Sequence, residues 1–178
     1  MSPSDSFFAD ATPSGGHDAS VGVGLGADLE LKLEHVFDIR IDFLARDIFG
    51  PVFGELKQGY TSVKEGLVRG PRLNGRLVPQ GGADWPLVRP DGVVEANAHY
   101  MIEADDGSLI YIRNMGYIYG PRGDRPGYFR CTPYFRAPVG PHDWLNRTVI
   151  VGGGLRRPGV PGNPDKPDHT LFRYFSVG

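Results

Sequence analysis

The densest group of side chains that can do chemistry is the loop motif GGADW at residues 81–85. Asp84 places a carboxyl group beside the large aromatic Trp85, and the two glycines let a ligand approach the backbone closely. A carboxyl group in a pocket can donate or accept a proton, with the indole as a wall of that pocket. The same pair also fits a structural role, in which Asp84 caps a turn and Trp85 closes one end of the fold.

A second group lies in YMIEADDGSLIYIRNMG, residues 100–116. Its Asp106-Gly107 dipeptide predicts a tight type I′ turn between two antiparallel strands. A two-residue turn pairs Tyr100 with Arg113, and alternation then predicts Tyr100, Tyr111 and Arg113 on one face. A slip of one residue would exchange the two faces, so this prediction depends on the register.

These residues together suggest acid–base chemistry on a carbonyl compound. Arg113 or Arg130 would polarise the carbonyl oxygen, while Tyr111 or Asp84 moves a proton. Because a buried guanidinium group is costly without an acid or a ligand anion beside it, an Asp84–Arg ion pair is the structural alternative. The sequence assigns catalysis to Asp84, Tyr111 and Arg113, and substrate binding to His35, Trp85, Tyr100, Tyr128, Arg130, Trp144, Asn146 and Arg147.

Composition excludes several other classes of protein. A net charge of −2 gives no basic field for nucleic acid and no run of Lys or Arg for a membrane surface. No nucleotide-binding fingerprint, metal-ligand spacing or GxSxG elbow occurs, so we expect no cofactor and no metal. With no long apolar segment and no signal pattern, the expected location is cytoplasmic. The lone Cys131 is either a small buried apolar residue or a reactive thiol.

The elements that must position these residues are strands. Residues 31–43 alternate with a period of two and place His35 on an apolar face, either as a core histidine or as an acid–base group in a pocket. Residues 44–65 look irregular, and residues 144–151 look like a strand. About eight to ten strands predict an all-β fold: a single antiparallel up-and-down barrel over residues 28–178, after a flexible tail over residues 1–27. Such a barrel has room for one small ligand.

Six motifs resemble one family: GPRLNG at 70–75, GGADW at 81–85, RPDG at 89–92, DDGSLIYIRNMG at 105–116, YFRCTPYF at 128–135 and WLNRTVIVGGG at 144–154. Over residues 29–178 the chain is similar to domain-of-unknown-function family 3237, also called uncharacterised protein family 0311. The resemblance implies an antiparallel barrel similar to calycin and allene-oxide-cyclase barrels, often dimeric. In natural-product pathways it implies cofactor-free cyclases and isomerases, including addition of a hydroxyl across an alkene. His99 and Glu103 depart from the family pattern, which more often has Arg at these positions, and Arg136 stands where an acid is usual.

Two hypotheses about function follow. The first is a cofactor-independent isomerase, cyclase or lyase that acts on a small phenolic or polyketide-like carbonyl compound. The second is a non-catalytic barrel that carries or senses such a ligand, and polar groups in the lumen would serve both. A homodimer is also expected, because the hairpin face that carries Met101, Ile110 and Ile112 is half apolar.

Overall fold

The computed structural model describes residues 30–120, 127–160, 162–163 and 167–178. The chain divides into Met1–Leu31 and Lys32–Gly178, and the second unit contains all the strands described here. The predicted tail, residues 1–27, lies outside the described residues. The described strands are β1 (Leu33–Phe49), β2 (Lys57–Arg69), β3 (Gly75–Leu77), β4 (Ala83–Asp84), β5 (Leu87–Val88), β6 (Val94–Ala104), β7 (Leu109–Tyr119), β8 (Tyr128–Arg136), β9 (Ile150–Arg157) and β10 (His169–Val177).

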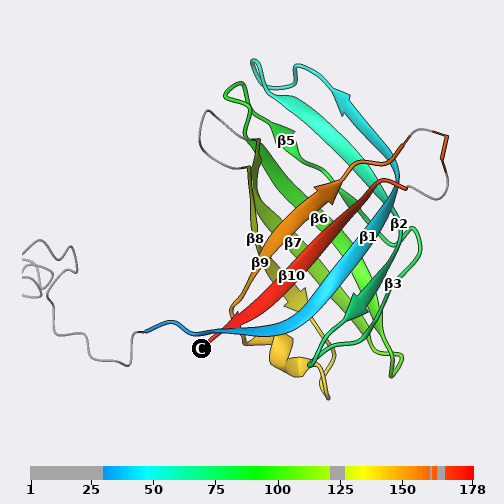
Figure 1. Ribbon diagram of the computed structural model, residues 1–178, viewed down its shortest axis with the longest axis vertical. Coiled ribbons are helices and arrows are strands. Elements are labelled where there is room, and N and C mark those ends of the chain that lie inside the picture. The colour runs from blue at the N-terminus through cyan, green and yellow to red at the C-terminus, as the bar shows by residue number, and fades with distance from the viewer. Residues whose placement is uncertain (1–29, 121–126, 161, 164–166) are drawn as a thin grey trace, which may run out of the picture. The chain divides into compact units, whose positions relative to one another are not determined.

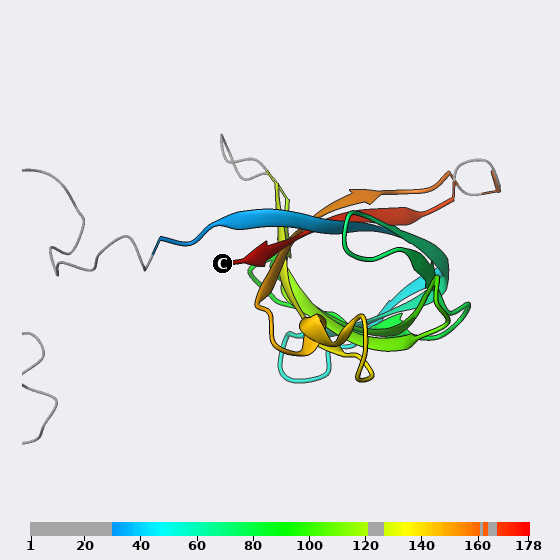
Figure 2. The ribbon, with the colours of Figure 1, turned by 90° about the horizontal axis from the view of Figure 1, so that it is seen from below.

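The strands form a closed antiparallel barrel (Figures 1 and 2). Strand β1 pairs with β2 on one side and with β10 on the other, which closes the ring. The short strands β3, β4 and β5 each pair with both β2 and β6, so they fill one position of the barrel in three pieces. With β1, β2 and β6 to β10, this makes eight positions in up-and-down order. The predicted all-β barrel is confirmed.

The long hairpin of β1 and β2 corrects one prediction. Residues 44–65 looked irregular, yet β1 continues to Phe49, and β2 begins at Lys57. Two register shifts lie on either side of Phe43, with one extra residue in β2 at Lys64 and one in β1 at Leu44, and they interrupt the period-two pattern. In β2 the inward positions Gly59 and Thr61 are small or polar, so the strand has no continuous apolar face for the sequence to show.

The hairpin of β6 and β7 has a register one residue away from the predicted one. Ala104 N–H donates to Ser108 C=O, and Gly107 alone among the three turn residues has a positive φ, of 86°. The turn therefore has three residues rather than two, with the glycine at the bulge position. His99 pairs with Arg113, and Tyr100 pairs with Ile112.

The two halves of the barrel differ in their filling. The end that holds the β6–β7 turn is packed with buried side chains, among them Val36, Phe37, Leu77, Ile102, Ile110 and Ile112. The 3-10 helix η2 (Asp143–Asn146) inserts the buried Leu145 into this end. Figure 2 shows η2 at this end of the ring. The sequence predicted a strand over residues 144–151, but β9 begins only at Ile150. In the described part of the chain, no helix is long and apolar enough to span a membrane.

Candidate functional site

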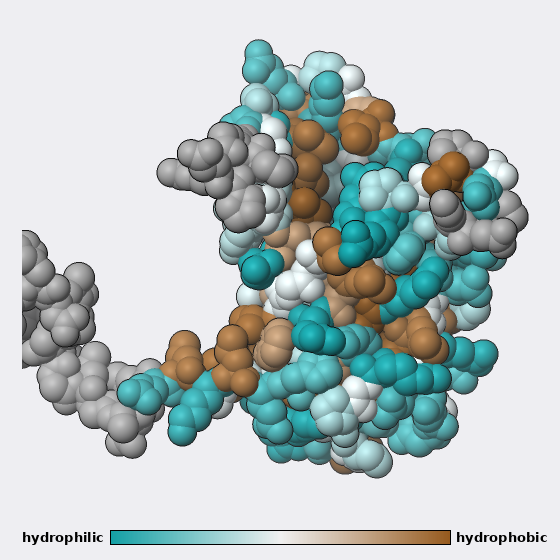
Figure 3. Space-filling view, viewed as in Figure 1, coloured by the Kyte–Doolittle hydropathy of each residue, from teal (hydrophilic) through white to brown (hydrophobic). Residues whose placement is uncertain are grey.

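The opposite half of the barrel is hollow. A cavity of about 390 Å³ lies between the inward faces of the strands and opens beside the β1–β2 turn and the end of β9. Figure 3 shows a strip of apolar residues set back between polar side chains at this end of the barrel. Most of the wall is apolar, and its largest apolar side chains are Ile41, Phe43, Ile118, Phe129 and Phe172. The polar side chains in this wall are therefore the candidates for chemistry.

Asp84 is the carboxyl group of the cavity. Strand β4 places it opposite Thr61 of β2 and Ala98 of β6, and all three line the cavity. Its Oδ1 accepts a hydrogen bond from the backbone N–H of Asn97 at 2.8 Å. Burial raises the pKa of Asp84 to about 6, although this hydrogen bond and the positive charge of Arg46 partly offset the effect. Its carboxyl group can thus exchange a proton near neutral pH.

Tyr100 and Asn114 supply buried polar atoms deeper in the same cavity. The Tyr100 hydroxyl and the Asn114 Oδ1 have no hydrogen-bond partner with good geometry among the described residues. Burial raises the pKa of Tyr100 well above its ordinary value, so its hydroxyl stays protonated and able to donate. Both atoms are buried from solvent, beside the side chains of Tyr174 and Cys131 respectively, so a ligand that reaches them must replace these neighbours.

Charged side chains surround the mouth of the cavity. Arg46 of β1 donates to Asp168 through Nε and through a second bond of 3.1 Å, and its guanidinium lies 4.3 Å from the centre of the Phe43 ring. Arg156 of β9 lines the same mouth. Burial and the neighbouring charge of Arg46 lower the pKa of Arg156, and the carboxylate of Asp168 acts in the opposite direction. The mouth therefore holds two arginines, Arg46 and Arg156, together with two acids, Asp47 and Asp168.

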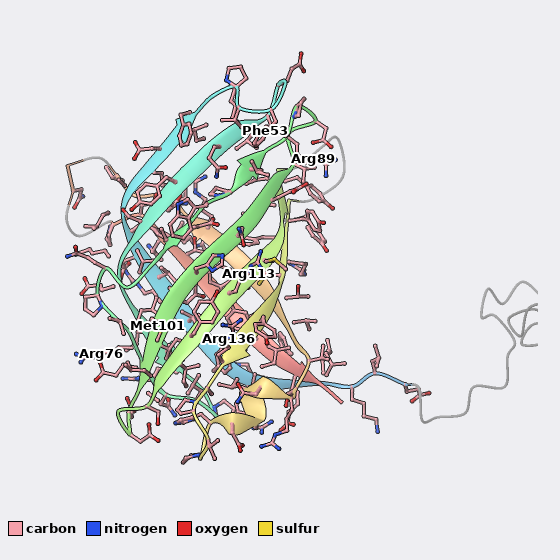
Figure 4. The ribbon with its side chains drawn as sticks, turned by 180° about the vertical axis from the view of Figure 1, so that it is seen from behind. Phe53, Arg76, Arg89, Met101, Arg113 and Arg136 are labelled. Carbon is pink, nitrogen blue, oxygen red and sulfur yellow. The ribbon has the colours of Figure 1, made fainter. Side chains whose placement is uncertain are left out.

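Tyr111 and Arg113 do not point into the lumen as predicted. The corrected register turns them to the outer face with His99, and Figure 4 shows Met101, Arg113 and Arg136 on that side of β6, β7 and β8. The same correction buries Ile110 and Ile112, so they cannot belong to an exposed dimer face. The prediction was wrong because the sequence pointed to a two-residue turn, and one extra turn residue exchanges the faces.

The outer face holds its own hydrogen-bonded network. Arg113 Nε donates to Asn97 Oδ1 at 3.0 Å, and His99 Nε2 lies 3.2 Å from the same oxygen. This oxygen can only accept, so His99 carries its proton on Nε2, and Nδ1 accepts from the Tyr111 hydroxyl at 2.6 Å. Burial and the charge of Arg113 lower the pKa of His99, which favours this neutral form.

Four of the predicted residues meet in a wider and more open hollow on the outside of the barrel, of about 980 Å³: Trp85, Arg113, Tyr128 and Arg130. Trp85 is 42% exposed, because alternation along β4 sends neighbouring side chains to opposite faces and Asp84 takes the inner one. The carboxyl group that lines this hollow among the described residues, Glu95, is paired with Arg89 at 3.3 Å. The lumen is therefore the stronger candidate for acid–base chemistry.

The remaining predicted residues have structural contacts outside the cavity. His35 lies at a bulge of β1, and its Nε2 is 3.0 Å from Asp38 Oδ1, so it does not face the apolar lumen as predicted. Trp144 packs under the guanidinium of Arg72 at 3.7 Å. Asn146 and Arg147 stabilise the segment that closes the packed end: Asn146 bonds both backbone groups of Ala137, and Arg147 pairs with Asp143.

Sequence reasoning missed six polar residues that line the cavity: Arg46, Asp47, Thr61, Asn114, Arg156 and Thr170. Arg46 and Thr61 lie in the stretch interpreted as irregular, and Arg156 follows the strand predicted over residues 144–151 and belongs to none of the motifs. For Asn114 a signal was present. Asn114 lies two residues after Ile112 in β7 and therefore shares its face. A three-residue turn in the prediction would have placed both side chains in the lumen.

The raised pKa of Asp84 predicts a specific dependence of stability on pH. The folded state binds the proton of Asp84 more tightly than the unfolded state does, so this group destabilises the fold as the pH rises from about 4 through about 6. Asp84→Asn, whose amide oxygen still accepts from Asn97, should raise the free energy of unfolding at pH 8 by up to about 3 kcal/mol. At pH 4 the wild-type protein and the variant should have the same free energy of unfolding. Urea titrations at both pH values measure the difference. A difference that does not change with pH would contradict this assignment.

Cys131 is expected to be unreactive in the folded protein. It is 4% exposed, and burial raises the pKa of its thiol to about 11, so little thiolate forms at neutral pH. An aromatic disulfide reagent should label the native protein at least ~10²-fold more slowly than the same protein in urea. Comparable rates in the two conditions would show that the thiol is accessible.

Comparisons with known proteins agree with this barrel. The family described as "Protein of unknown function (DUF3237)" matches residues 31–175. A UPF0311 protein of Clostridium acetobutylicum is 32% identical over 160 residues, which covers 83% of this chain and 95% of the relative. A UPF0311 protein of Rhodopseudomonas palustris is 33% identical over 103 residues, which covers 51% of this chain and 67% of the relative.

Three solved structures share the fold. A β-barrel-like protein from Acinetobacter baumannii has a TM-score of 0.72 and 24% identity, covering 84% of this chain and 97% of its own. A protein of unknown function from Clostridium acetobutylicum has a TM-score of 0.70 and 28% identity, covering 84% and 98%. A protein described as an enzyme from Penicillium herquei has a TM-score of 0.61 and 20% identity, covering 83% and 95%.

Proposed function

Since the chain belongs to the DUF3237 family of proteins of unknown function, we propose that it is a cofactor-independent isomerase or cyclase that works by acid–base catalysis inside the barrel. The observation that carries the proposal is a carboxyl group with a pKa of about 6, Asp84, in the wall of a cavity that is closed at its far end. The substrate class is a small phenolic or polyketide-like carbonyl compound. Its flat apolar body fits the aromatic wall, and its oxygens meet the few polar groups.

The proposed reaction is the intramolecular addition of a hydroxyl group across an enone. The Asp84 carboxylate accepts the proton of the attacking hydroxyl, whose oxygen then bonds to the β-carbon. The Tyr100 hydroxyl donates a hydrogen bond to the carbonyl oxygen, where negative charge develops. Asp84 finally returns the proton to the α-carbon, so the product is an isomer of the substrate and no oxidant or reductant is needed.

A carrier would need only the apolar wall, and two features favour the enzyme. Keeping Asp84 largely buried without an ion pair to any described residue costs folding free energy, which a carrier of apolar ligands has no reason to expend. Tyr100, whose hydroxyl forms no hydrogen bond of good geometry with the described residues although Tyr174 lies beside it, belongs to the same wall. One structural neighbour is also described as an enzyme, which is consistent with catalysis on this fold.

The test uses 2′-hydroxychalcone and its 4-carboxy derivative, which cyclise to flavanones by the proposed addition. The uncatalysed reaction gives a racemic product, so chiral chromatography separates catalysis in a shaped cavity from background. We expect an excess of one enantiomer that scales with protein concentration. A racemic product at the background rate, together with tight binding of the flavanones, would favour the carrier instead.

A further inference from the structure

We propose that the ligand on which Asp84 acts carries an anionic group, a carboxylate, phenolate or enolate, and that Arg156 binds this group at the mouth of the cavity; this rests on the proposed function. Arg156 and Asp84 line the same cavity, which spans from the end of β9 to β4 in the opposite wall. The ligand would therefore lie with its anionic group at the mouth and its reacting part inside.

The two arginines at the mouth differ in their partners. The Arg46 guanidinium and the Asp168 carboxylate are paired with each other through two hydrogen bonds. Arg156 forms no ion pair with any residue that the structure describes, although Asp168 is near enough to act on it electrostatically. The guanidinium of Arg156 thus has no hydrogen-bonded carboxylate among the described residues, although Asp47 also lines the cavity, and its surroundings include a second guanidinium. An anion bound between the two arginines would relieve that repulsion and accept charge-assisted hydrogen bonds.

The position of Asp84 fixes the orientation of such a ligand. Above a pH of about 6 Asp84 is ionised, so a second anion placed beside it inside the cavity would be repelled. The rings of Phe129 and Phe172 form part of the wall and favour an aromatic body between the two charged ends. The arrangement therefore selects a flat ligand with its negative charge at one end.

The experiment compares two probes of the same shape, 2-naphthoate and 2-naphthamide, by titration calorimetry at pH 7.5 and low ionic strength. We expect the protein to bind the naphthoate about tenfold more tightly than the naphthamide. Arg156→Met should remove this tenfold preference and leave the affinity for the amide unchanged. The matched control is Arg157→Met, which removes the same charge from the next residue of β9, outside the cavity lining, and should keep the preference.

Several results would overturn the proposal. Equal affinity for the two probes, or no binding of either, would show that the mouth does not select an anion. A loss of preference in Arg157→Met equal to that in Arg156→Met would assign the effect to the general field of the surface. If Arg156→Met does not fold, the wild-type protein still gives a test: naphthoate binding should weaken between about 0.01 M and about 0.5 M salt, and naphthamide binding should not.

These outcomes are separable from those of the proposed function. Binding of the naphthalene probes involves no turnover, so a failed preference leaves the cyclisation by Asp84 standing. Conversely, an absence of cyclisation together with a preserved tenfold preference would leave a barrel that binds aromatic anions.

Discussion

Asp84→Asn should slow the cyclisation of 2′-hydroxychalcone by about 10²–10⁴-fold, because it removes the group that carries the proton. The asparagine keeps the size of the side chain and the acceptor for the backbone N–H of Asn97, so the cavity should keep its shape. Affinity for flavanone should therefore change by less than about threefold. Steady-state kinetics and calorimetry on the same preparations measure the two quantities.

The pH dependence sharpens this prediction. Catalysis by the Asp84 carboxylate requires its ionised form, so the wild-type rate should fall as the pH drops through about 6, and the variant should lack this inflection. Asp105→Asn serves as the control, since it makes the same chemical change on an exposed residue at the packed end of the barrel. An inflection that persists in Asp84→Asn, or an equal loss of binding and turnover, would remove the catalytic assignment.

Ile110→Ala should destabilise the protein by about 2–5 kcal/mol, a substantial part of the roughly 5–15 kcal/mol that stabilises an ordinary domain. Ile110 is fully buried in the packed half of the barrel, where the surrounding side chains cannot collapse completely into the space that is left. Ligand binding should be unchanged, because this residue does not line the cavity. Chemical denaturation and titration of flavanone test the two statements together.

Ile118→Ala is the matched comparison at the other end of the same strand. Ile118 lines the existing cavity and is only partly buried, so truncating it should cost less than about 1 kcal/mol, near the low end of large-to-small changes. It should instead enlarge the space available to a ligand. Equal losses of stability in the two variants would show that the barrel is packed uniformly from end to end.

The architecture could be predicted from the sequence because turns and alternation repeat along the chain. The alternation of residues 31–43 and the glycine of the β6–β7 turn led correctly to a barrel. The hairpin faces could not be predicted, since Asp106-Gly107 is compatible with two-residue and three-residue turns that give opposite faces. Strand β2 was missed because a strand that lines a hollow does not need apolar residues at its inward positions.

The site could be predicted only in part, because it depends on the same hairpin register. Asp84 and Tyr100 line the lumen as predicted. Tyr111 and Arg113 lie on the outer face, because the predicted register was one residue away from the observed one. The two arginines at the mouth, Arg46 and Arg156, are 110 residues apart by their numbers and meet only when the barrel closes. Neither residue lies in a motif, so nothing local in the sequence indicated them.

The pairing of β8 with β9 has a consequence for how ligands can be detected. These strands share two register pairs, Arg130 with Gly153 and Cys131 with Gly152, whereas β7 and β8 share nine, from Tyr111–Arg136 to Tyr119–Tyr128. Backbone amides along this junction should therefore exchange with deuterated solvent faster than those between β7 and β8. Phe129 lies beside the junction and also lines the cavity. Slower exchange here would then report any compound that occupies the lumen, even before its reaction is known.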